Sequence, residues 1–226
     1  MNEKPAVIIA HGLLMNQFVM RFLKTQFSRL GYDTYMYDYC TIEFNEQRVC
    51  KELKVLTQSI ANHKKCFLGH SMGGLVFRKF LENQNFLDAQ NTSLVTIGTP
   101  HTQSLLAHKL SNTILNPIFK YSGNAGLTQE LGAWSEKYPL GCIAGTRSIG
   151  LNNFFGLFID LDKTSASDGT VYVSEAICPG ATDSCTLDLT HTTLIFSLDT
   201  VAQAHNFFCH KKFILEPEII KKFKIR

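Results

Sequence analysis

Gly69-His70-Ser71-Met72-Gly73 is the most diagnostic stretch of this chain, because it stands where an apolar run meets a helical pattern. The preceding residues 66–68 predict a short buried strand, and from 74 to about 82 the apolar residues have helical spacing. A G-x-S-x-G pattern on such a turn holds its serine in strained backbone, with the hydroxyl clear of the sheet. The pattern predicts a nucleophilic serine at position 71. The alternative is a glycine-rich turn that only packs a helix on a strand.

Beyond this turn, apolar runs alternate with helical patterns, which is typical of βαβ units and a mainly parallel sheet. Strands are expected at 5–10, 32–38, 66–70, 93–98 and 140–145. Helices are expected at 15–30, 45–62, 72–84, 103–115 and 199–214. Gly31 follows the last apolar turn of the first helix and predicts its end. The fold class is therefore expected to be α/β.

Length and composition are those of a globular protein with one domain. The 226 residues are 45% apolar and 18% charged, and the net charge of +3 is too small to indicate nucleic-acid binding. We expect a single domain over 1–226 with a short cap or insertion at about 103–139. No apolar segment approaches the ~18 residues that span a bilayer. The basic tail at 221–226 is typical of a solvated chain end.

The N-terminus and the cysteines both favour a cytoplasmic location. An expected strand at 5–10 leaves no room for a secretory signal. The seven cysteines are an odd number without a C-x-x-C pair, and most lie in apolar surroundings typical of buried small residues. Cys178 and Cys185 flank a turn-rich stretch and are the best candidates for a disulfide, which a cytoplasmic setting disfavours. No zinc or calcium site is evident, and no cofactor is implied.

A serine nucleophile needs a base within hydrogen-bond reach and a carboxylate that orients the base. In sheets of this type the chain order is serine, acid, histidine. Asp168 stands at a tight turn that enters an apolar segment, and His191 lies in a loop 23 residues later. A loop histidine can turn its imidazole toward the serine. Asp168 and His191 are therefore the predicted acid and base.

Other residues compete for these two roles. His101 also follows an expected strand and is the alternative base. His205 lies on an amphipathic helix and is expected to be structural, and the side chain of His70 is expected to point away from Ser71. The alternative acids are Asp160, Asp162, Asp183 and Asp188.

The oxyanion formed during acyl transfer needs preorganised donors. One is expected to be the backbone N–H of Met72, at the start of the helix after the nucleophile. The other is expected in the turn His11-Gly12-Leu13 after the first strand, where the N–H of Leu13 can face the site. A plain strand end with a glycine turn is the alternative interpretation of this segment.

At these positions the chain resembles the α/β-hydrolases of the lipase and esterase type. More narrowly, it resembles bacterial triacylglycerol lipases and the related deacylases of lipid-anchored glycans. The matching stretches are 7–13, 69–74, 96–101, 168–171 and 190–192, in the order of the family. The resemblance implies an α/β-hydrolase fold, with helices on both faces of the sheet. It also implies Ser71, Asp168 and His191 as a catalytic triad, with Leu13 and Met72 as oxyanion donors.

The expected activity is a serine carboxylic-ester hydrolase that forms an acyl-enzyme. The expected substrate is a small-molecule or lipid ester with an apolar acyl group, and transient contact with a membrane surface is compatible with that class. Candidates to line the acyl pocket are Phe154, Phe155, Phe158, Leu105, Leu106 and Trp134. Two alternatives stay open: a thioesterase or amidase on the same fold, and a non-catalytic hydrolase-fold binding protein.

Overall fold

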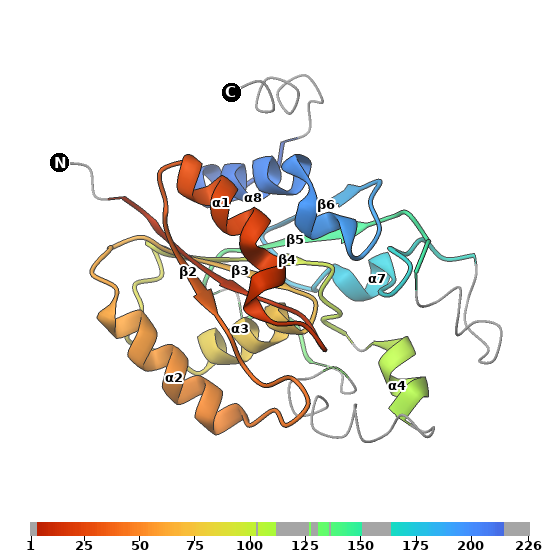
Figure 1. The fold of residues 1–226 in the computed structure, drawn as a ribbon, viewed down its shortest axis with the longest axis horizontal. Coiled ribbons are helices and arrows are strands. Elements are labelled where there is room, and N and C mark those ends of the chain that lie inside the picture. The colour runs from red at the N-terminus through yellow and green to blue at the C-terminus, as the bar shows by residue number, and fades with distance from the viewer. Residues whose placement is uncertain are drawn as a thin grey trace.

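A parallel sheet forms the centre of the molecule in a computed structural model, which describes residues 4–102, 104–111, 127, 131–135, 137–150 and 164–214. The strand order is β2-β1-β3-β4-β5-β6, and every neighbouring pair is parallel (Figure 1). The strands are β1 (Ala6–Ala10), β2 (Asp33–Tyr37), β3 (Lys65–His70), β4 (Thr92–Ile97), β5 (Leu140–Gly145) and β6 (Asp183–Leu187). Because all six run the same way, the loops after them meet at one edge of the sheet.

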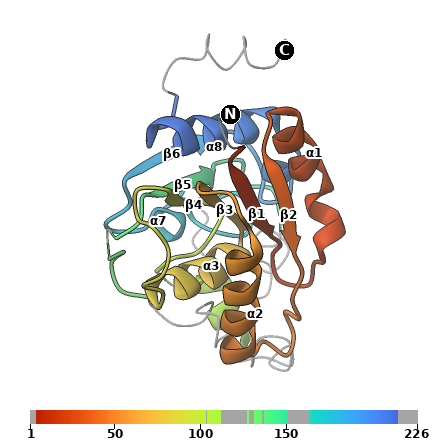
Figure 2. The same ribbon diagram turned by 90° about the vertical axis from the view of Figure 1, so that its left-hand side faces the viewer.

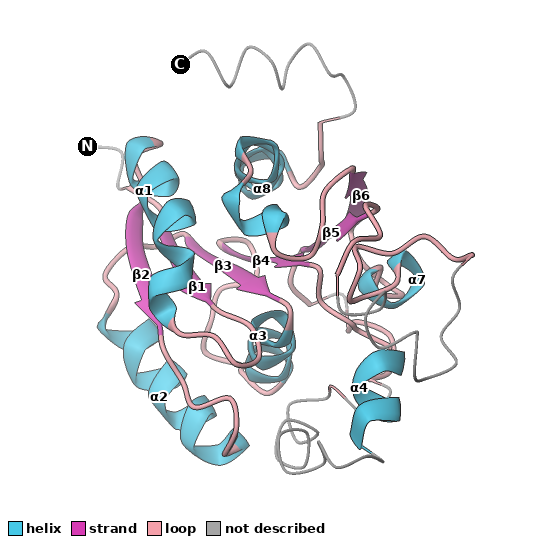
Figure 3. Ribbon diagram, turned by 45° about the vertical axis from the view of Figure 1, so that its right-hand side comes forward, coloured by secondary structure: helices cyan, strands magenta, loops and turns pink. Residues whose placement is uncertain are grey.

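Helices cover both faces of this sheet. In Figure 2, α1 and α8 lie on one side and α2 and α3 on the other, and Figure 3 shows the sheet between the two layers. The α-helices are α1 (Arg21–Arg29), α2 (Glu46–Ser59), α3 (Met72–Glu82), α4 (Leu105–Ser111), α7 (Val173–Ala176) and α8 (Leu198–His210). Two short 3-10 helices are η1 (Gln17–Met20) and η3 (Thr193–Phe196).

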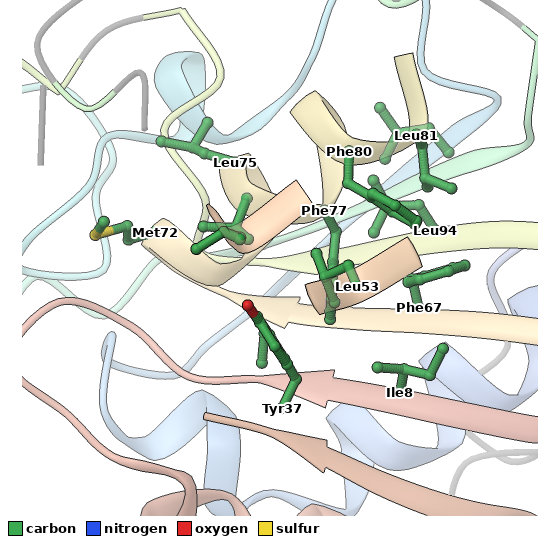
Figure 4. Close-up of a cluster of buried hydrophobic side chains, with 14 of the residues drawn as sticks. Ile8, Tyr37, Leu53, Phe67, Met72, Leu75, Phe77, Phe80, Leu81 and Leu94 are labelled. Atoms are coloured by element: carbon green, nitrogen blue, oxygen red, sulfur yellow. The ribbon is translucent and has the colours of Figure 1, made fainter. Parts of the chain in front are cut away.

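The two-residue period of a strand sends its side chains into two separate cores. In β1, Ala6, Ile8 and Ala10 pack with α2 and α3, as Figure 4 shows around Ile8. Val7 and Ile9 pack on the opposite face with α1 and α8. Both faces of the strand are therefore buried, which explains why its sequence is continuously apolar.

The expected strands and helices are confirmed to within a few residues, apart from the helix at 103–115, of which the described part is α4. Gly31 has a φ of 88° just after α1, which confirms the helix end placed there. The sequence did not predict β6 or the four-residue helix α7. Much of the expected cap at 103–139 lies outside the described residues, so its extent stays a prediction.

The described residues can also be examined for membrane-spanning helices and disulfides. None of their helices combines the length and the apolar character needed to cross a bilayer. All seven cysteines are free thiols, Cys178 and Cys185 included.

Candidate active site

Ser71 occupies a strained turn between β3 and α3. Its φ of 53° and ψ of −125° lie in a region that L-residues rarely adopt, as the G-x-S-x-G pattern predicts. The turn is tight: a Cβ at Gly69 would lie 2.5 Å from the Gly74 backbone, and one at Gly73 would lie 2.5 Å from the His11 carbonyl oxygen. Ser71 is 8% exposed, so only a small part of the residue is accessible to solvent.

Asp168 and His191 form a buried pair. His191 Nδ1 donates to Asp168 Oδ2 at 2.7 Å, and this bond leaves Nε2 as the other functional nitrogen of the ring. The Asp-Gly turn shapes the acid locally, because Oδ1 accepts from the amides of Thr170 at 2.9 Å and Val171 at 2.7 Å. The carboxylate is thus fixed by three hydrogen bonds, and a fixed carboxylate can orient an imidazole.

The end of β4 brings Ser71 and this pair into one neighbourhood. The Ser71 amide donates to the Ile97 carbonyl at 2.8 Å, and Thr99 Oγ1 donates to the Ser71 carbonyl at 2.9 Å. Between them lies Gly98, with a φ of 55°. A Cβ at Gly98 would lie 3.0 Å from both Asp168 Oδ2 and His191 Nδ1. Ser71, Asp168 and His191 therefore all lie next to residues 97–99 at the edge of the sheet.

The loop after β1, which carries Leu13, passes close to Ser71. A Cβ at Gly12 would lie 3.0 Å from Ser71 Cβ, so this loop passes directly over the serine. Neither the Leu13 amide nor the Met72 amide donates a hydrogen bond to another described residue. Both N–H groups are therefore unpaired among the described residues, which is a condition for an oxyanion donor.

The loop after β2 holds the Leu13 segment in place. His11 Nε2 lies 2.9 Å from Asp38 Oδ1, and the Tyr39 hydroxyl donates to the His11 carbonyl at 2.8 Å. Thr41 Oγ1 accepts from the amide of Leu14, whose φ of 56° is also strained. These supports were not predicted, because they join residues about 27 positions apart that no short motif connects.

A cleft of about 950 Å³ opens next to this loop. Met15 lies between the loop and the cleft. A Cβ at Gly12 would lie 3.5 Å from its sulfur, and the residue is one of those that line the cleft. The other lining residues are Asn16, residues 38–45, Arg48, Val49 and Glu52. The cleft therefore borders the loop after β1, and Ser71 is not among the residues that line it.

The structure separates the alternative base from this neighbourhood. His101 is fully buried, and its Nε2 lies 3.0 Å from Thr96 Oγ1 and 3.7 Å from Cys142 Sγ. Burial, with a smaller contribution from Arg78, lowers the pKa of His101 to about 3, so the ring is neutral. His205 lies on α8 with Nδ1 3.0 Å from the Tyr32 hydroxyl, in keeping with the structural role expected for it.

The alternative acids have other partners or lie outside the described residues. Asp183 accepts from the Phe213 amide at 2.7 Å, and the exposed Asp188 pairs with Arg147 at 2.7 Å. Asp160 and Asp162 fall in the part of the chain that the structure does not describe, as do the pocket candidates Phe154, Phe155 and Phe158.

Of the remaining pocket candidates, only one faces solvent. Leu105 is 42% exposed, whereas Leu106 and Trp134 are buried. The Trp134 ring packs in the core beside α3, where its Nε1 donates to the Tyr138 carbonyl at 2.6 Å. Among the described residues, no group of three or more His, Cys, Asp and Glu side chains is arranged to hold a metal ion.

Two groups near the site were given no catalytic role in the sequence analysis, which expected the His70 side chain only to point away from Ser71. His70 is fully buried with its ring 4.6 Å from that of His191, a contact with no sequence signal. Glu175 accepts from the amides of Leu105 at 2.8 Å and Tyr172 at 3.0 Å, which ties the start of α4 to the loop of Asp168. Burial is the main cause that raises the pKa of Glu175 to about 7.

A sequence-family model described as "PGAP1-like alpha/beta domain" matches residues 14–121. The match includes Ser71 and Met72 but ends before Asp168 and His191. No match to a curated protein sequence was found.

Solved structures with low sequence identity have a similar fold. The metagenomic carboxyl esterase MGS0156 is 16% identical, with a TM-score of 0.61 over 84% of this chain, which spans 65% of that esterase. The lin2722 gene product of Listeria innocua is 16% identical, with a TM-score of 0.55 over 95% of this chain and 100% of its own. Carboxylesterase CesB (YbfK) from Bacillus subtilis is 13% identical, with a TM-score of 0.55 over 93% of this chain and 85% of its own. With its parallel six-stranded sheet between two helix layers, the chain has the α/β-hydrolase fold, and residues 14–121 are similar to the PGAP1-like domain.

Proposed function

We propose that this protein is a serine carboxylic-ester hydrolase that forms an acyl-enzyme on esters with an apolar acyl group. The observation that carries the proposal is the Asp168–His191 hydrogen bond of 2.7 Å at the sheet edge where Ser71 occupies its strained turn. Two of the solved structures with a similar fold are carboxylesterases by name, which favours the ester bond as the target.

In the proposed reaction, Ser71 Oγ attacks the ester carbonyl while His191 Nε2 takes its proton. Asp168 holds the imidazole in the Nδ1–H tautomer and stabilises the imidazolium that forms. His191 then returns the proton to the departing alcohol, which leaves an acyl group on Ser71. Water activated by the same imidazole releases the acid and restores the serine.

The amides of Leu13 and Met72 are the proposed oxyanion donors. Each lies on a segment that is held before substrate arrives: Leu13 by the loop after β2, and Met72 at the start of α3. Loss of one such donor typically costs 10²–10³ in rate, about 3–4 kcal/mol. Because both are backbone groups, Leu13→Ala should reduce the rate much less than Ser71→Ala.

Exposed apolar side chains support an apolar ester as substrate. Leu14, Phe18 and Ile42 follow the carboxyl ends of β1 and β2, and each is between 46% and 59% exposed. Apolar groups at the rim of an active site favour lipid or other apolar substrates over small polar ones. Transient contact with a membrane surface and a cytoplasmic location remain part of the proposal, and fractionation of cells that express the tagged chain tests both.

The proposal is tested with a fluorophosphonate probe and a panel of p-nitrophenyl esters of increasing acyl length. Wild type should be labelled, Ser71→Ala should not, and the control Ser28→Ala, at an exposed serine, should behave as wild type. Matched acyl thioesters and anilides of the preferred acyl group separate an esterase from a thioesterase or amidase.

Each alternative gives a distinct result. Labelling that survives Ser71→Ala would exclude catalysis at this serine. Folded wild type that neither reacts with the probe nor hydrolyses any of the three bond types would be a binding protein. A kcat/KM that is higher for the thioester or the anilide would change the bond but keep the site.

A further inference from the structure

His70 lies between the nucleophile and the base, although the proposed reaction gives it no role. It is the last residue of β3, directly before Ser71, and it is fully buried. Its Nε2 lies 3.1 Å from the backbone carbonyl oxygen of His191. A carbonyl can only accept, so Nε2 carries the proton and donates to it.

The other nitrogen of this ring, Nδ1, has neither a proton nor a hydrogen-bond partner among the described residues. Burial, followed by the neighbouring His191, holds the pKa of His70 well below its usual range, so the ring is neutral and Nδ1 has no proton. Nδ1 is buried without a hydrogen-bond partner among the described residues. It faces the backbone at Gly12, where a Cβ would lie 3.1 Å away. His70 therefore acts through Nε2 alone.

His191 is held on both sides of its own backbone. Its amide donates to the Asp168 carbonyl at 2.8 Å, while its carbonyl accepts from His70. The two imidazole rings lie 4.6 Å apart at an interplanar angle of 46°. Because His70 is neutral, it can lie this close to His191 without repelling the imidazolium that the proposed reaction forms.

We propose that His70 is a positioning residue for the base: its Nε2–H fixes the backbone of His191, so that the imidazole keeps its bond to Asp168 and its reach toward Ser71. This inference rests on the proposed function for its consequence in the reaction, but the geometry it asserts can be measured without any turnover. Mere packing of the ring is the competing explanation, and it predicts that any side chain of similar size would serve.

Four substitutions separate the hydrogen bond from the packing. His70→Gln extends a donor to about the position of Nε2, whereas His70→Asn ends near Nδ1 and falls short of the carbonyl. His70→Phe keeps an aromatic ring but has no donor. If the His70→Phe variant does not fold, His70→Leu is used in its place. For each, kcat and KM are measured on the preferred p-nitrophenyl ester, the unfolding midpoint by circular dichroism, and the low-field proton resonance of His191 Nδ1–H by NMR.

The expected result is a loss in kcat on the order of 10²-fold for His70→Asn and His70→Phe, with KM nearly unchanged. Their His191 Nδ1–H resonance should broaden or disappear, and His70→Gln should retain both the resonance and most of kcat. The inference is overturned if His70→Phe keeps the resonance and wild-type kcat, or if His70→Gln fails to the same degree as His70→Phe. If Ser71→Ala shows that the proposed function is wrong, the resonance still decides whether His70 positions His191.

Discussion

Asp168 and His191 are joined twice, once through their side chains and once through their backbones. The side-chain bond from Nδ1 to Oδ2 is 2.7 Å, and the His191 amide donates to the Asp168 carbonyl at 2.8 Å. The two residues are 23 positions apart, so the loops that carry them are locked to each other independently of the imidazole. A change in the carboxylate alone should therefore alter the chemistry and leave the loops in place.

Asp168→Asn tests this directly. The amide keeps the volume of the carboxylate and the backbone bond to His191, but it no longer holds the imidazole in the Nδ1–H tautomer or stabilises the imidazolium. We expect kcat to fall by about 10⁴ with a small change in unfolding midpoint. Steady-state kinetics on the preferred ester and circular dichroism measure the two quantities. A decrease of less than tenfold would transfer the role of acid to Asp160 or Asp162.

Gly98→Ala should damage the same pair from the backbone side. The new Cβ would lie 3.0 Å from both Asp168 Oδ2 and His191 Nδ1, on a residue whose φ of 55° already disfavours a side chain. Gly31→Ala is the matched control, because its φ is 88° and a Cβ there meets nothing within 4 Å.

Both substitutions should cost about 1–2 kcal/mol of unfolding free energy from backbone strain, measured by urea denaturation. Only Gly98→Ala should also reduce kcat, by about 10²-fold, since it displaces the acid–base pair. An equal kcat in the two variants would contradict this prediction. It would mean that Asp168 and His191 can be displaced by the new Cβ without any loss of activity.

The sequence was sufficient for the central strands and for the strained turn at Ser71 because their signals are local. β1, β4 and β5 are buried along their whole length, and β3 is buried apart from Lys65, so each contains a run of mostly apolar residues. β6 is an edge strand with mostly half-buried residues and the polar sequence Asp-Ser-Cys-Thr-Leu, which carries no such run. β6 is a strand because it pairs with β5, and its own sequence carries no strand pattern.

The parts of the site that the sequence did not predict all depend on contacts between distant segments. Asp168 could be proposed because an Asp-Gly turn has its own local signature. The contact of His70 with His191 joins positions 121 apart, and the contact of Glu175 with the start of α4 joins positions 70 apart. A sequence motif identifies the position of a residue in the chain. The contacts of its side chain depend on the order of the strands in the sheet, which the motif does not give.

Gly12→Ala should impair the site without loss of the fold. A Cβ at this position would lie 3.0 Å from Ser71 Cβ and 3.1 Å from His70 Nδ1, so the loop after β1 must shift by a few tenths of an ångström. We expect kcat to decrease at least tenfold, because the Leu13 amide moves with the loop. Gly132→Ala, where a Cβ meets nothing within 4 Å, is the control and should keep wild-type kinetics. Wild-type kcat in Gly12→Ala would remove Leu13 from the oxyanion hole.

Glu175 should give the protein a pH-dependent stability. It is 4% exposed, and burial and then the nearby Asp168 raise its pKa from 4.5 to about 7, despite the two amides that it accepts. A carboxyl whose pKa is higher in the folded than in the unfolded state holds more protons when folded. Its contribution to the unfolding free energy is therefore complete below about pH 4.5 and is lost as the pH rises through about 7.

Glu175→Gln abolishes this titration but leaves every other group in place. The difference in unfolding free energy between wild type and Glu175→Gln should therefore decrease by up to roughly 3 kcal/mol from pH 4.5 to pH 8. Urea denaturation at half-unit pH steps measures it, with the exposed Glu43→Gln as control. A difference that stays constant across this range would show that the pKa of Glu175 is the same in the folded and the unfolded protein. The hydrogen bonds from the amides of Leu105 and Tyr172 would then offset the cost of burying its charge.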